Sequence, residues 1–342
     1  MFVLQAAVVK GRGGIATAVA HYERMFRAVG VRSAVLFSGP SIDTLRQQGA
    51  DVLEAPPLLT SPLAGVLPLF ADLRTQFSSR AGAEPVVVIA HSDLTIPALR
   101  RLAPNARFVT PCHSDKVKHK RSADLVIALN AAQRDRAAAG LPSVRVAMLG
   151  NPYVAEQPPR LPETSAPPRF NFVGRFINTK DPMLLARAAA QMTPHASLRF
   201  IGDGELIDEV GSLCADLGLA NVEFSGWLPS PFAAFHANDI LVLPSHWEGL
   251  PYLLQEALDH GVATIAAGNA GNRAALADGA YGGLFPVGDA AALAEEMRAA
   301  LADLDGLRAK AEKGRAALRA RYGAEPFWRA LTAELEKVSG NA

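Results

Sequence analysis

The chain has 342 residues, 49% of them hydrophobic, and a formal net charge of +1 at pH 7. That length exceeds what one hydrophobic core usually supports, so we expect two domains. The near-neutral charge gives no electrostatic basis for the whole molecule to bind nucleic acid or a strongly anionic surface. The two cysteines, Cys112 and Cys214, lie in different segments, which excludes a disulfide framework and a cysteine-rich zinc site.

The first residues, "MFVLQAAVVKGRGG", lack the basic start and the small-residue cleavage site of a signal peptide. The longest apolar candidate for a membrane span, 58–70, is interrupted by prolines and shorter than the ~18 residues that a span needs. We therefore expect a soluble, cytoplasmic protein.

Short apolar runs alternate with helical patterns along the whole chain. Most runs are continuously apolar, which is typical of strands buried on both faces of a parallel sheet. Their alternation with helices predicts repeated βαβ units. The predicted strands are 2–9, 32–37, 85–90, 107–111, 125–129, 145–149, 170–173, 198–201, 222–225, 239–243, 263–267 and 283–287.

Six of the eighteen residues at 151–168 are proline, a composition typical of a stiff, extended linker. The predicted organisation is an N-terminal domain at 1–155, a linker at 156–168 and a C-terminal domain at 169–323. An amphipathic helix at 324–342 follows, and its apolar stripe can pack back on the N-terminal domain. The expected fold class is α/β, with two doubly wound, Rossmann-like domains facing a cleft. Such sheets bind ligands beyond the carboxyl ends of their strands.

The first predicted strand is followed by a glycine-rich turn with Gly11, Gly13 and Gly14. Such a turn binds a dinucleotide or simply makes a tight connection. The second strand ends with Ser38 and Gly39 rather than with the acidic residue of the dinucleotide fingerprint. A nicotinamide-dependent oxidoreductase is therefore disfavoured.

Two histidines, His91 and His113, stand at the carboxyl edges of the strands at 85–90 and 107–111, and each is followed by Ser-Asp. The repetition suggests that both face the ligand cleft. The alternative is that each histidine, with its Ser-Asp neighbours, caps the helix that follows.

A basic run, "KVKHKRSAD", follows His113. A solvated face is one interpretation. Its place after a strand end favours the other, a basic lip that receives an anionic acceptor such as phosphorylated lipid A core or a lipid-linked diphosphate, with peripheral contact at the inner membrane face. The four residues of this lip are Lys116, Lys118, Lys120 and Arg121.

In the second half, the strand at 170–173 is followed by Gly174, Arg175 and Lys180, and then by Asp181-Pro182, which predicts a capped helix start. Two cations at a strand end can neutralise a diphosphate. The alternative is two exposed basic loop residues. The turn "FIGDGEL", with Gly202, predicts a second backbone turn at the same edge, although many such turns carry Gly and Asp.

The stretch "SHWEGLPYLLQEAL" at 245–258 joins a buried strand to a helix that Pro251 begins. We expect backbone amides of the turn at Gly249 and Leu250, together with the helix dipole, to make an anion site. Glu248 stands at the strand end and Glu256 lies in the second helical turn. One carboxylate near a reacting group and another on a ribose diol describe a nucleotide-sugar site. A loop-tip charge and a solvated helix glutamate are the alternative.

The ordered motifs "VGRF…K…IGDGEL…FSGW…PSHWEGLPYLLQEAL…GGLFPVGD" resemble the C-terminal domain of glycosyltransferase family 4, which has the GT-B fold. The Glu-x7-Glu pair, Glu248 to Glu256, is the hallmark of that family. The resemblance covers essentially the whole second half. It implies a retaining, metal-independent transfer of a sugar from a nucleotide-diphosphate donor to a saccharide or lipid-linked acceptor, with no other cofactor.

The resemblance also implies roles for single residues. Arg175 and Lys180 bind the diphosphate and stabilise the leaving group, and Glu248 contacts the donor sugar. Glu256 holds the ribose hydroxyls, while the turn 249–251 presents amides to the donor.

In the first half, Gly13 and Gly14 match the family's loop for donor and acceptor. His113 matches a position near the transferred sugar. His91 and the basic run are assigned to the acceptor side. No Asp-x-Asp motif stands at a strand end to hold a metal.

One segment departs from the family pattern. The family has a glycine-rich turn followed by a glutamate after the next strand, whereas this chain reads "AAGNAGNRAAL", with Arg273 near the place of the acid. A GT-B nucleotide-sugar epimerase is a rival, but it needs several carboxylates around the sugar, and few stand at strand ends of the first half. A non-catalytic nucleotide-sugar-binding protein is another rival, which the complete set of charged residues opposes.

Overall fold

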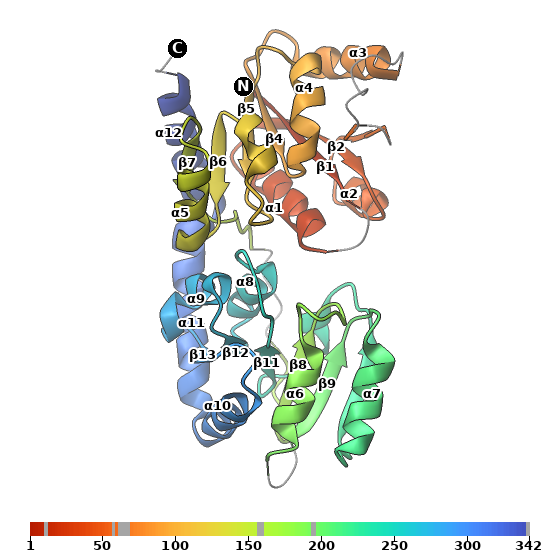
Figure 1. Ribbon diagram of the computed structural model, residues 1–342, viewed down its shortest axis with the longest axis vertical. Helices are drawn as coiled ribbons and strands as arrows, with labels where there is room; N and C mark the ends of the chain where they lie inside the picture. Colours follow the sequence, from red (N-terminus) through yellow and green to blue (C-terminus); the bar gives the residue numbers. More distant parts are fainter. Residues whose placement is uncertain (10–12, 57–58, 61–68, 156–160, 193–195, 340–342) are drawn as a thin grey trace. The chain divides into compact units, whose positions relative to one another are not determined.

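The computed structural model describes residues 1–342 except 10–12, 57–58, 61–68, 156–160, 193–195 and 340–342. The chain forms two compact units, shown in Figure 1. The first contains Met1–Val154 together with Arg321–Ala342, and the second contains Ala155–Ala320. Gly11 of the predicted glycine turn and residues 156–160 of the predicted linker lie outside the described residues.

The first unit is built on one seven-stranded parallel sheet with the order β3-β2-β1-β4-β5-β6-β7. Its strands are β1 (Phe2–Val8), β2 (Arg32–Ser38), β3 (Val52–Glu54), β4 (Val86–Ala90), β5 (Arg107–Pro111), β6 (Leu125–Ala128) and β7 (Arg145–Met148). Its helices are α1 (Gly14–Ala28), α2 (Ile42–Gln47), α3 (Leu69–Ala81), α4 (Ile96–Leu102), α5 (Ala131–Gly140) and α12 (Ala324–Ser339). Short 3-10 turns, η1 (Asp93–Thr95) and η2 (Lys118–Ser122), follow β4 and β5.

The second unit repeats this architecture on a six-stranded parallel sheet with the order β10-β9-β8-β11-β12-β13. Its strands are β8 (Arg169–Val173), β9 (Ser197–Ile201), β10 (Val222–Gly226), β11 (Ile240–Leu243), β12 (Ala263–Ala267) and β13 (Gly283–Phe285). Its helices are α6 (Pro182–Ala189), α7 (Ile207–Asp216), α8 (Tyr252–Asp259), α9 (Ala270–Ala275), α10 (Ala290–Ala302) and α11 (Leu304–Tyr322). The 3-10 turns are η3 (Pro231–Ala234) and η4 (Ala277–Gly279).

The predicted fold class, with two parallel-sheet Rossmann-like domains, is confirmed. The physical basis is the continuous apolar character of the strands. All four residues of β11 and all five of β12 are buried, because helices cover both faces of the sheet. Every predicted strand is present, with ends that shift by one or two residues. The one addition is β3, which is too short, at three residues, to give a recognisable apolar run.

In both sheets the strand order reverses once, between β1 and β4 in the first unit and between β8 and β11 in the second. Helices leave two neighbouring strands in opposite directions at such a point, so a crevice opens beyond their carboxyl ends. The segments that follow β1, β4, β8 and β11 are therefore the places where the fold itself favours a ligand.

Helix α12 returns to the first unit and packs on α1. The ring of Phe327 contacts the ring of Tyr22 with 5.7 Å between centroids, and Trp328 contacts Phe26 at 5.8 Å. Arg145, the first residue of β7, donates from Nε to Glu334 Oε2 at 2.5 Å and forms an ion pair with it. The apolar stripe seen in the sequence thus becomes part of the first unit's core.

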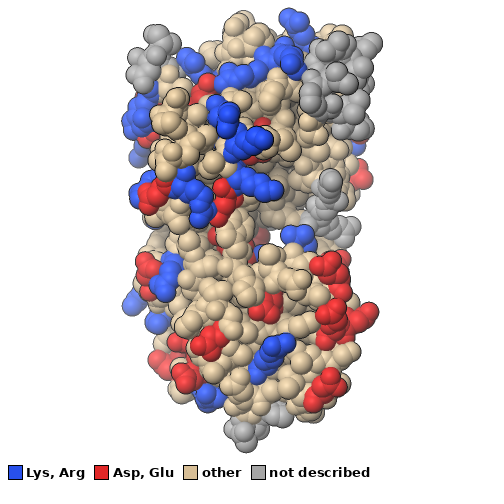
Figure 2. All heavy atoms as spheres, viewed as in Figure 1, with Lys and Arg blue, Asp and Glu red and all other residues tan. Residues whose placement is uncertain are grey.

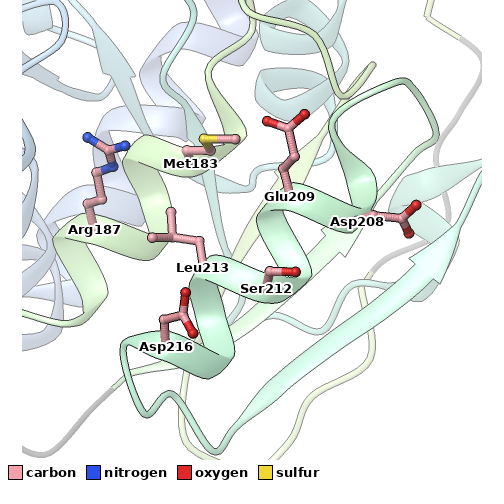
Figure 3. Close-up of a pocket in the computed structure, with 7 residues that line it drawn as sticks. All are labelled: Met183, Arg187, Asp208, Glu209, Ser212, Leu213 and Asp216. Carbon is pink, nitrogen blue, oxygen red and sulfur yellow. The ribbon is translucent and has the colours of Figure 1, made fainter.

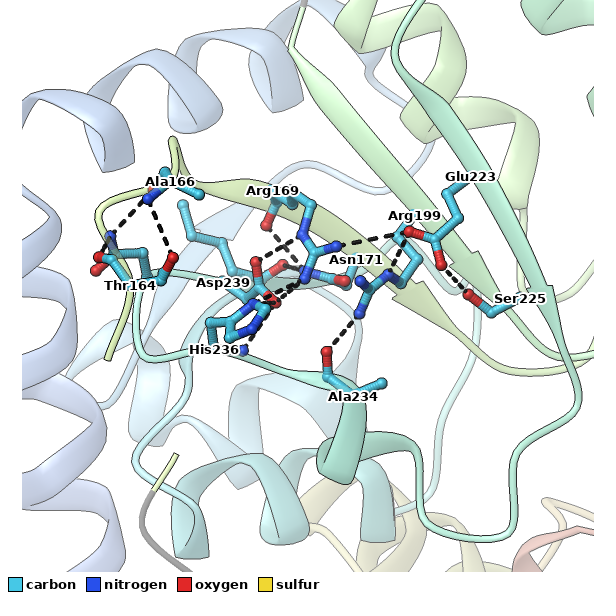
Figure 4. A network of polar contacts seen from close by, with 12 residues as sticks. Thr164, Ala166, Arg169, Asn171, Arg199, Glu223, Ser225, Ala234, His236 and Asp239 are labelled. Atoms are coloured by element: carbon cyan, nitrogen blue, oxygen red, sulfur yellow. Dashed lines mark hydrogen bonds and ion pairs between the residues drawn. The ribbon is translucent and has the colours of Figure 1, made fainter. Parts of the chain in front are cut away.

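The described end of the predicted linker is fastened to the second unit, as Figure 4 shows. The carbonyls of Thr164 and Ala166 accept hydrogen bonds from the side chain of Asn238. Beside them, Arg169 pairs with the buried Asp239 at 2.9 Å. Because these groups lie at the amino ends of β8 and β11, they are at the opposite edge from the predicted ligand site.

The turns after β8 and β9 approach each other closely at backbone level. Phe176 N donates to Asp203 O at 2.7 Å, and Gly174 N donates to Ile201 O at 3.0 Å. A Cβ on Gly202 would collide with the carbonyl oxygen of Gly174. The glycine is therefore needed for this turn pair to form.

Replacing Gly202 by alanine should destabilise the second unit. Its φ of +141° is one that alanine rarely adopts, and the new Cβ has no room. We expect the free energy of unfolding, measured in urea, to fall by at least about 2 kcal/mol. Gly211→Ala is the control, since it lies in α7 with no described atom within 4 Å of the new Cβ. It should be neutral or stabilise by up to about 1 kcal/mol, and equal midpoints for the two variants would contradict the close approach.

Candidate functional site

The turns after β8 and β11 are tied together at the reversal point of the second sheet. Lys180 Nζ pairs with Glu248 Oε1. His246 N donates to Thr179 O at 2.9 Å, and His246 Nε2 lies 2.9 Å from Asp181 Oδ2. The structure thus brings together two residues that the sequence analysis assigned separately, one to the diphosphate and one to the sugar.

Glu248 is a mostly buried charge. Its side chain is 10% exposed and that of Lys180 is 24% exposed. A buried carboxylate needs a charged or hydrogen-bonding partner, because desolvation otherwise costs several kcal/mol. Lys180 supplies that partner, so this ion pair adds to the two contacts of His246 that join the turns.

Asp181 differs from its predicted role. It precedes α6, which begins at Pro182 as expected, but its side chain makes no capping hydrogen bond. Its backbone is left-handed, with φ of 46°, and its carboxylate contacts His246 instead. The residue therefore serves the joint between the two turns rather than the helix end.

The start of helix α9 contacts the turn that carries Glu248. Asn269 Nδ2 donates to Ser245 O at 2.9 Å, while Asn269 Oδ1 accepts from two amides of the first turn of α9. A Cβ on Gly271 would collide with the carbonyl oxygen of Glu248. Arg273, the departure from the family pattern, bonds Gly268 O at 3.0 Å. Helix α9 is therefore capped by the side chain of Asn269.

Helix α8 follows this turn. Pro251 is its N-cap residue and provides no side-chain cap, and Gly261 in a left-handed conformation follows its end. Leu250 is buried and Glu256 is partly buried.

Arg175 is exposed in the turn after β8, directly beyond Gly174. Among the described residues, no carboxylate lies within ion-pairing distance of its guanidinium. Of the two predicted diphosphate cations, one is therefore paired with Glu248 and the other faces solvent.

In the first unit, the two predicted histidines contact each other. His91 Nδ1 lies 3.0 Å from His113 Nε2, and the rings stack with 5.2 Å between centroids. Burial lowers the pKa of His113 to about 4, with the charge of Lys120 adding to the shift. Burial, followed by the effect of His113, lowers the pKa of His91 as well. Both imidazoles are thus neutral at pH 7, and neither caps a helix.

The glycine turn after β1 is described only from Gly13 onward. Gly13 is the N-cap residue of α1 and Gly14 is its first residue. Beyond the local backbone, no described atom lies within 4 Å of a Cβ built on either one.

One expectation for the basic run is wrong. Lys120 is 2% exposed, and its ammonium contacts Asp93 Oδ2 at 3.0 Å and Lys116 O at 2.5 Å. It stabilises the fold where η2 meets η1, so it cannot be part of an exposed lip. Lys116, Lys118 and Arg121 are exposed, as expected.

Sequence reasoning missed the polar partners of the predicted residues. Gln5 and Glu23 are buried and connect to His91, and His246 joins the two turns of the second unit. The one available signal was Gln5, a lone polar residue inside the apolar run "FVLQAAV".

The two units carry opposite net charges. The first holds 21 lysines and arginines against 13 aspartates and glutamates, a net charge of +8. The second holds 13 against 20, a net charge of −7. Figure 2 shows basic side chains spread over the first unit, while acidic ones predominate around α7 of the second.

A hollow of about 400 Å³ lies between α6 and α7 and carries three carboxylates (Figure 3). None of the predicted site residues lines it. Within the described part of the chain, no three His, Cys, Asp or Glu side chains gather in a way that would hold a metal ion. Nor does any helix among the described residues have the length and apolarity to cross a membrane.

The ion pair of the second unit can be tested by a double-mutant cycle. Lys180→Met should lower the free energy of unfolding by about 1–3 kcal/mol, because it leaves a buried carboxylate without its partner. Adding Glu248→Gln should cost less than the sum of the two single effects.

Arg308→Met is the matched control. Arg308 pairs at 3.8 Å with Asp305, which is 98% exposed, so its loss should cost less than about 0.5 kcal/mol. Strictly additive effects of Lys180→Met and Glu248→Gln would show that the pair does not hold the turns together.

The sequence of the second unit matches a known protein family. Residues 154–317 match the family model for glycosyl transferases group 1. The chain is 31% identical over 119 residues to the lipopolysaccharide core biosynthesis glycosyltransferase LpsE of Rhizobium meliloti. It is 30% identical over 127 residues to the UDP-Gal:alpha-D-GlcNAc-diphosphoundecaprenol alpha-1,3-galactosyltransferase of Escherichia coli. These matches cover 34% and 35% of this chain, and about a third of the length of each relative (35% and 33%).

Structural similarity extends over both units. The Anabaena protein HepE, solved in complex with UDP and glucose, superposes with a TM-score of 0.79 over 98% of this chain and 99% of its own. At 17% sequence identity, this match establishes a shared fold and no more. The similarity in sequence is to the glycosyl transferases group 1 family, and it lies in residues 154–317, almost wholly within the second unit.

Proposed function

We propose that this protein is a retaining glycosyltransferase that moves a sugar from a nucleotide-diphosphate donor to a saccharide or lipid-linked acceptor. The observation that carries the proposal is the Lys180–Glu248 pair at the reversal point between β8 and β11. A cation and a carboxylate, joined where the fold favours a ligand, match the two ends of a nucleotide sugar, its diphosphate and its hydroxylated ring.

The second unit takes the donor in this proposal. Arg175 and Lys180 bind the diphosphate, and the turn at 249–251 adds backbone amides at the start of α8. Glu256, four residues further along α8, accepts hydrogen bonds from the ribose hydroxyls. These groups supply the charge stabilisation that a metal gives in other transferases, so the reaction proceeds without one.

Retention of the anomeric configuration is taken from the family resemblance. In the first unit, Asp93 pairs with Lys120 and Asp115 pairs with Arg136, which favours a same-face attack over a double displacement through either carboxylate. The acceptor hydroxyl attacks the anomeric carbon on the face that the diphosphate leaves. The bond from that carbon to the phosphate oxygen breaks, the new glycosidic bond forms, and the hydroxyl proton passes to the departing phosphate oxygen.

The acceptor belongs to the first unit in this proposal. Its net charge of +8 and the exposed Lys116, Lys118 and Arg121 favour an anionic acceptor, through long-range attraction and local contacts. The relatives named for lipopolysaccharide core and for a diphosphoundecaprenol-linked sugar support glycan synthesis on such an acceptor.

Hydrolysis of nucleotide sugars tests the donor assignment. Across uridine, guanosine and adenosine diphosphate sugars, we expect one to be hydrolysed slowly without acceptor, in EDTA as well as without it. Arg175→Ala should lower turnover by about two to three orders of magnitude, because it removes a stabiliser of the developing diphosphate charge. Arg187→Ala, an exposed arginine of α6 outside the proposed site, is the control and should leave turnover unchanged.

Three results would contradict this assignment. A strict need for added divalent metal would remove the role given to Arg175 and Lys180. Recovery of an epimerised nucleotide sugar would favour the epimerase. Binding of a nicotinamide cofactor in place of a nucleotide sugar would favour an oxidoreductase.

Neutralising the exposed lip tests the acceptor side. The triple variant Lys116→Gln, Lys118→Gln, Arg121→Gln should raise the apparent KM for an anionic acceptor and leave donor hydrolysis unchanged, because only acceptor binding is lost. The wild-type KM should also rise when salt is increased to about 0.5 M, since exposed charges are screened.

The control removes the same charge elsewhere on the first unit, through Arg74→Gln, Arg101→Gln and Arg329→Gln, all at exposed positions. If both triple variants raise KM equally, only net charge matters and the lip has no specific role. If neither does, residues 116–121 are a solvated face.

A further inference from the structure

We propose that a buried chain of hydrogen bonds holds the imidazole of His113 in one tautomer, with a proton on Nε2 and a lone pair on Nδ1. That lone pair then accepts a hydrogen bond from a substrate hydroxyl. The second step rests on the proposed function, because it places a sugar or an acceptor beside His113. The chain consists of four further side chains: Ser33, Glu23, Gln5 and His91.

The chain begins at Ser33 in β2, passes through Glu23 in α1 and continues across the first sheet. Ser33 Oγ donates to Glu23 Oε2 at 3.0 Å, and Gln5 Nε2 donates to Glu23 Oε1 at 2.6 Å. Gln5 Oε1 lies 2.8 Å from His91 Nε2, and His91 Nδ1 lies 3.0 Å from His113 Nε2. Gln5, His91 and Glu23 are 0%, 3% and 6% exposed, so water does not compete for these contacts.

The orientation of the Gln5 amide sets the direction of the whole chain. Its nitrogen faces two groups that can accept, the carbonyl oxygen of Val19 at 3.4 Å and the carboxylate of Glu23. Turning the amide over would place its oxygen against both of them. The oxygen of Gln5 therefore faces His91, and His91 must carry its proton on Nε2.

The two histidines then follow in order. A neutral His91 with a proton on Nε2 has only a lone pair on Nδ1, so His113 must donate from Nε2. A neutral His113 that donates from Nε2 has a lone pair on Nδ1. His113 is partly buried, and no described residue bonds its Nδ1.

The charges around the chain favour neutral imidazoles. Burial is the main cause that lowers the pKa of His113, and the effect of the Lys120 ammonium, which opposes a second positive charge, is larger than that of Asp93. The ring of Tyr22 packs edge-on against His91 at 5.1 Å and brings no charge. Burial raises the pKa of Glu23, and the hydrogen bonds that it accepts from Gln5 and Ser33 oppose this shift, while Arg27 and Asp51 act with opposite sign. The groups packed around His91 and His113 thus disfavour a positive charge on either imidazole.

Gln5 and His91 are positioning residues in this arrangement, because they act only through His113. Their strands, β1 and β4, flank the reversal point of the first sheet, and His113 follows β5 beside them. The fold thus delivers a hydrogen-bond acceptor to the edge where a ligand binds. A substrate hydroxyl that donates to His113 Nδ1 is held in one orientation. If it belongs to the acceptor, its oxygen becomes a better nucleophile, and if it belongs to the sugar, it holds the ring in place.

Nitrogen-15 NMR of the full-length, labelled protein tests the tautomers without any substrate. Long-range proton–nitrogen spectra distinguish a protonated ring nitrogen from a bare one, and His91→Gln and His113→Gln assign the two signals among the eight histidines. We expect the Nε2-protonated tautomer for both residues at pH 7. An Nδ1-protonated His113, or a mixture, overturns the proposal.

Gln5→Leu tests the origin of that tautomer. It removes the acceptor of His91 at similar volume, so His91 and His113 should shift to mixed tautomers. Thr110→Val is the matched control, since Thr110 is fully buried and its hydroxyl donates only to Ala90 O at 2.8 Å, beside but outside the chain. It should keep the wild-type spectrum. Unchanged tautomers in Gln5→Leu overturn the proposal, and the wild-type spectrum decides it if that variant does not fold.

Kinetics separates this proposal from the proposed function. Gln5→Leu should lower kcat for transfer by about three- to tenfold, the value of one hydrogen bond, with unchanged nucleotide affinity. Unchanged kcat with mixed tautomers would mean that no substrate hydroxyl uses Nδ1. Absence of any sugar transfer by the wild type would refute the proposed function, while the tautomer result would remain valid.

Discussion

The ion pair between Lys180 and Glu248 is the constraint on which the second unit's site depends. Glu248 is held in a turn that α9 supports, and its side chain is mostly buried. Lys180 provides its counter-charge from the turn after β8. A diphosphate that binds beside Arg175 must share Lys180 with this carboxylate. In the proposed function, the groups that take the donor are therefore in place before it binds, which reduces the reorganisation needed on binding.

The two units use the same topology for different chemistry. Each sheet reverses its strand order once, and in each the notable polar residues follow the flanking strands. The second unit places a cation and carboxylates there, suited to a charged and hydroxylated ligand. The first unit places two neutral imidazoles there, held by an internal chain of hydrogen bonds. The opposite net charges of the units are consistent with the proposed division into a donor side and an acceptor side.

The fold was predictable from the sequence, because a strand that is buried on both faces is a continuous run of apolar residues. The helix start at Pro182 and the left-handed Gly261 were also predictable from backbone chemistry. Side-chain partners were not, because they depend on which segments the topology brings together. Asp181 has the sequence of a helix cap, yet it bonds His246, a residue 65 positions away. Lys120 sits in a charged run, yet one side of that 3-10 turn faces Asp93 and is buried.

Calorimetric titration of the nucleotide tests the central claim, that the turn after β11 and helix α8 bind a nucleotide diphosphate. Wild-type protein should bind at least one of uridine, guanosine and adenosine diphosphate, and the nucleotide bound most tightly is then used with the variants. Glu256→Ala should bind it about ten to a hundred times more weakly, since a charged hydrogen-bond pair to the ribose is worth roughly 1.5–3 kcal/mol. Glu295→Ala, at an exposed position of α10, should bind as wild type does. Equal affinity of the Glu256→Ala variant and the wild type would contradict the ribose contact and, with it, this account of the site.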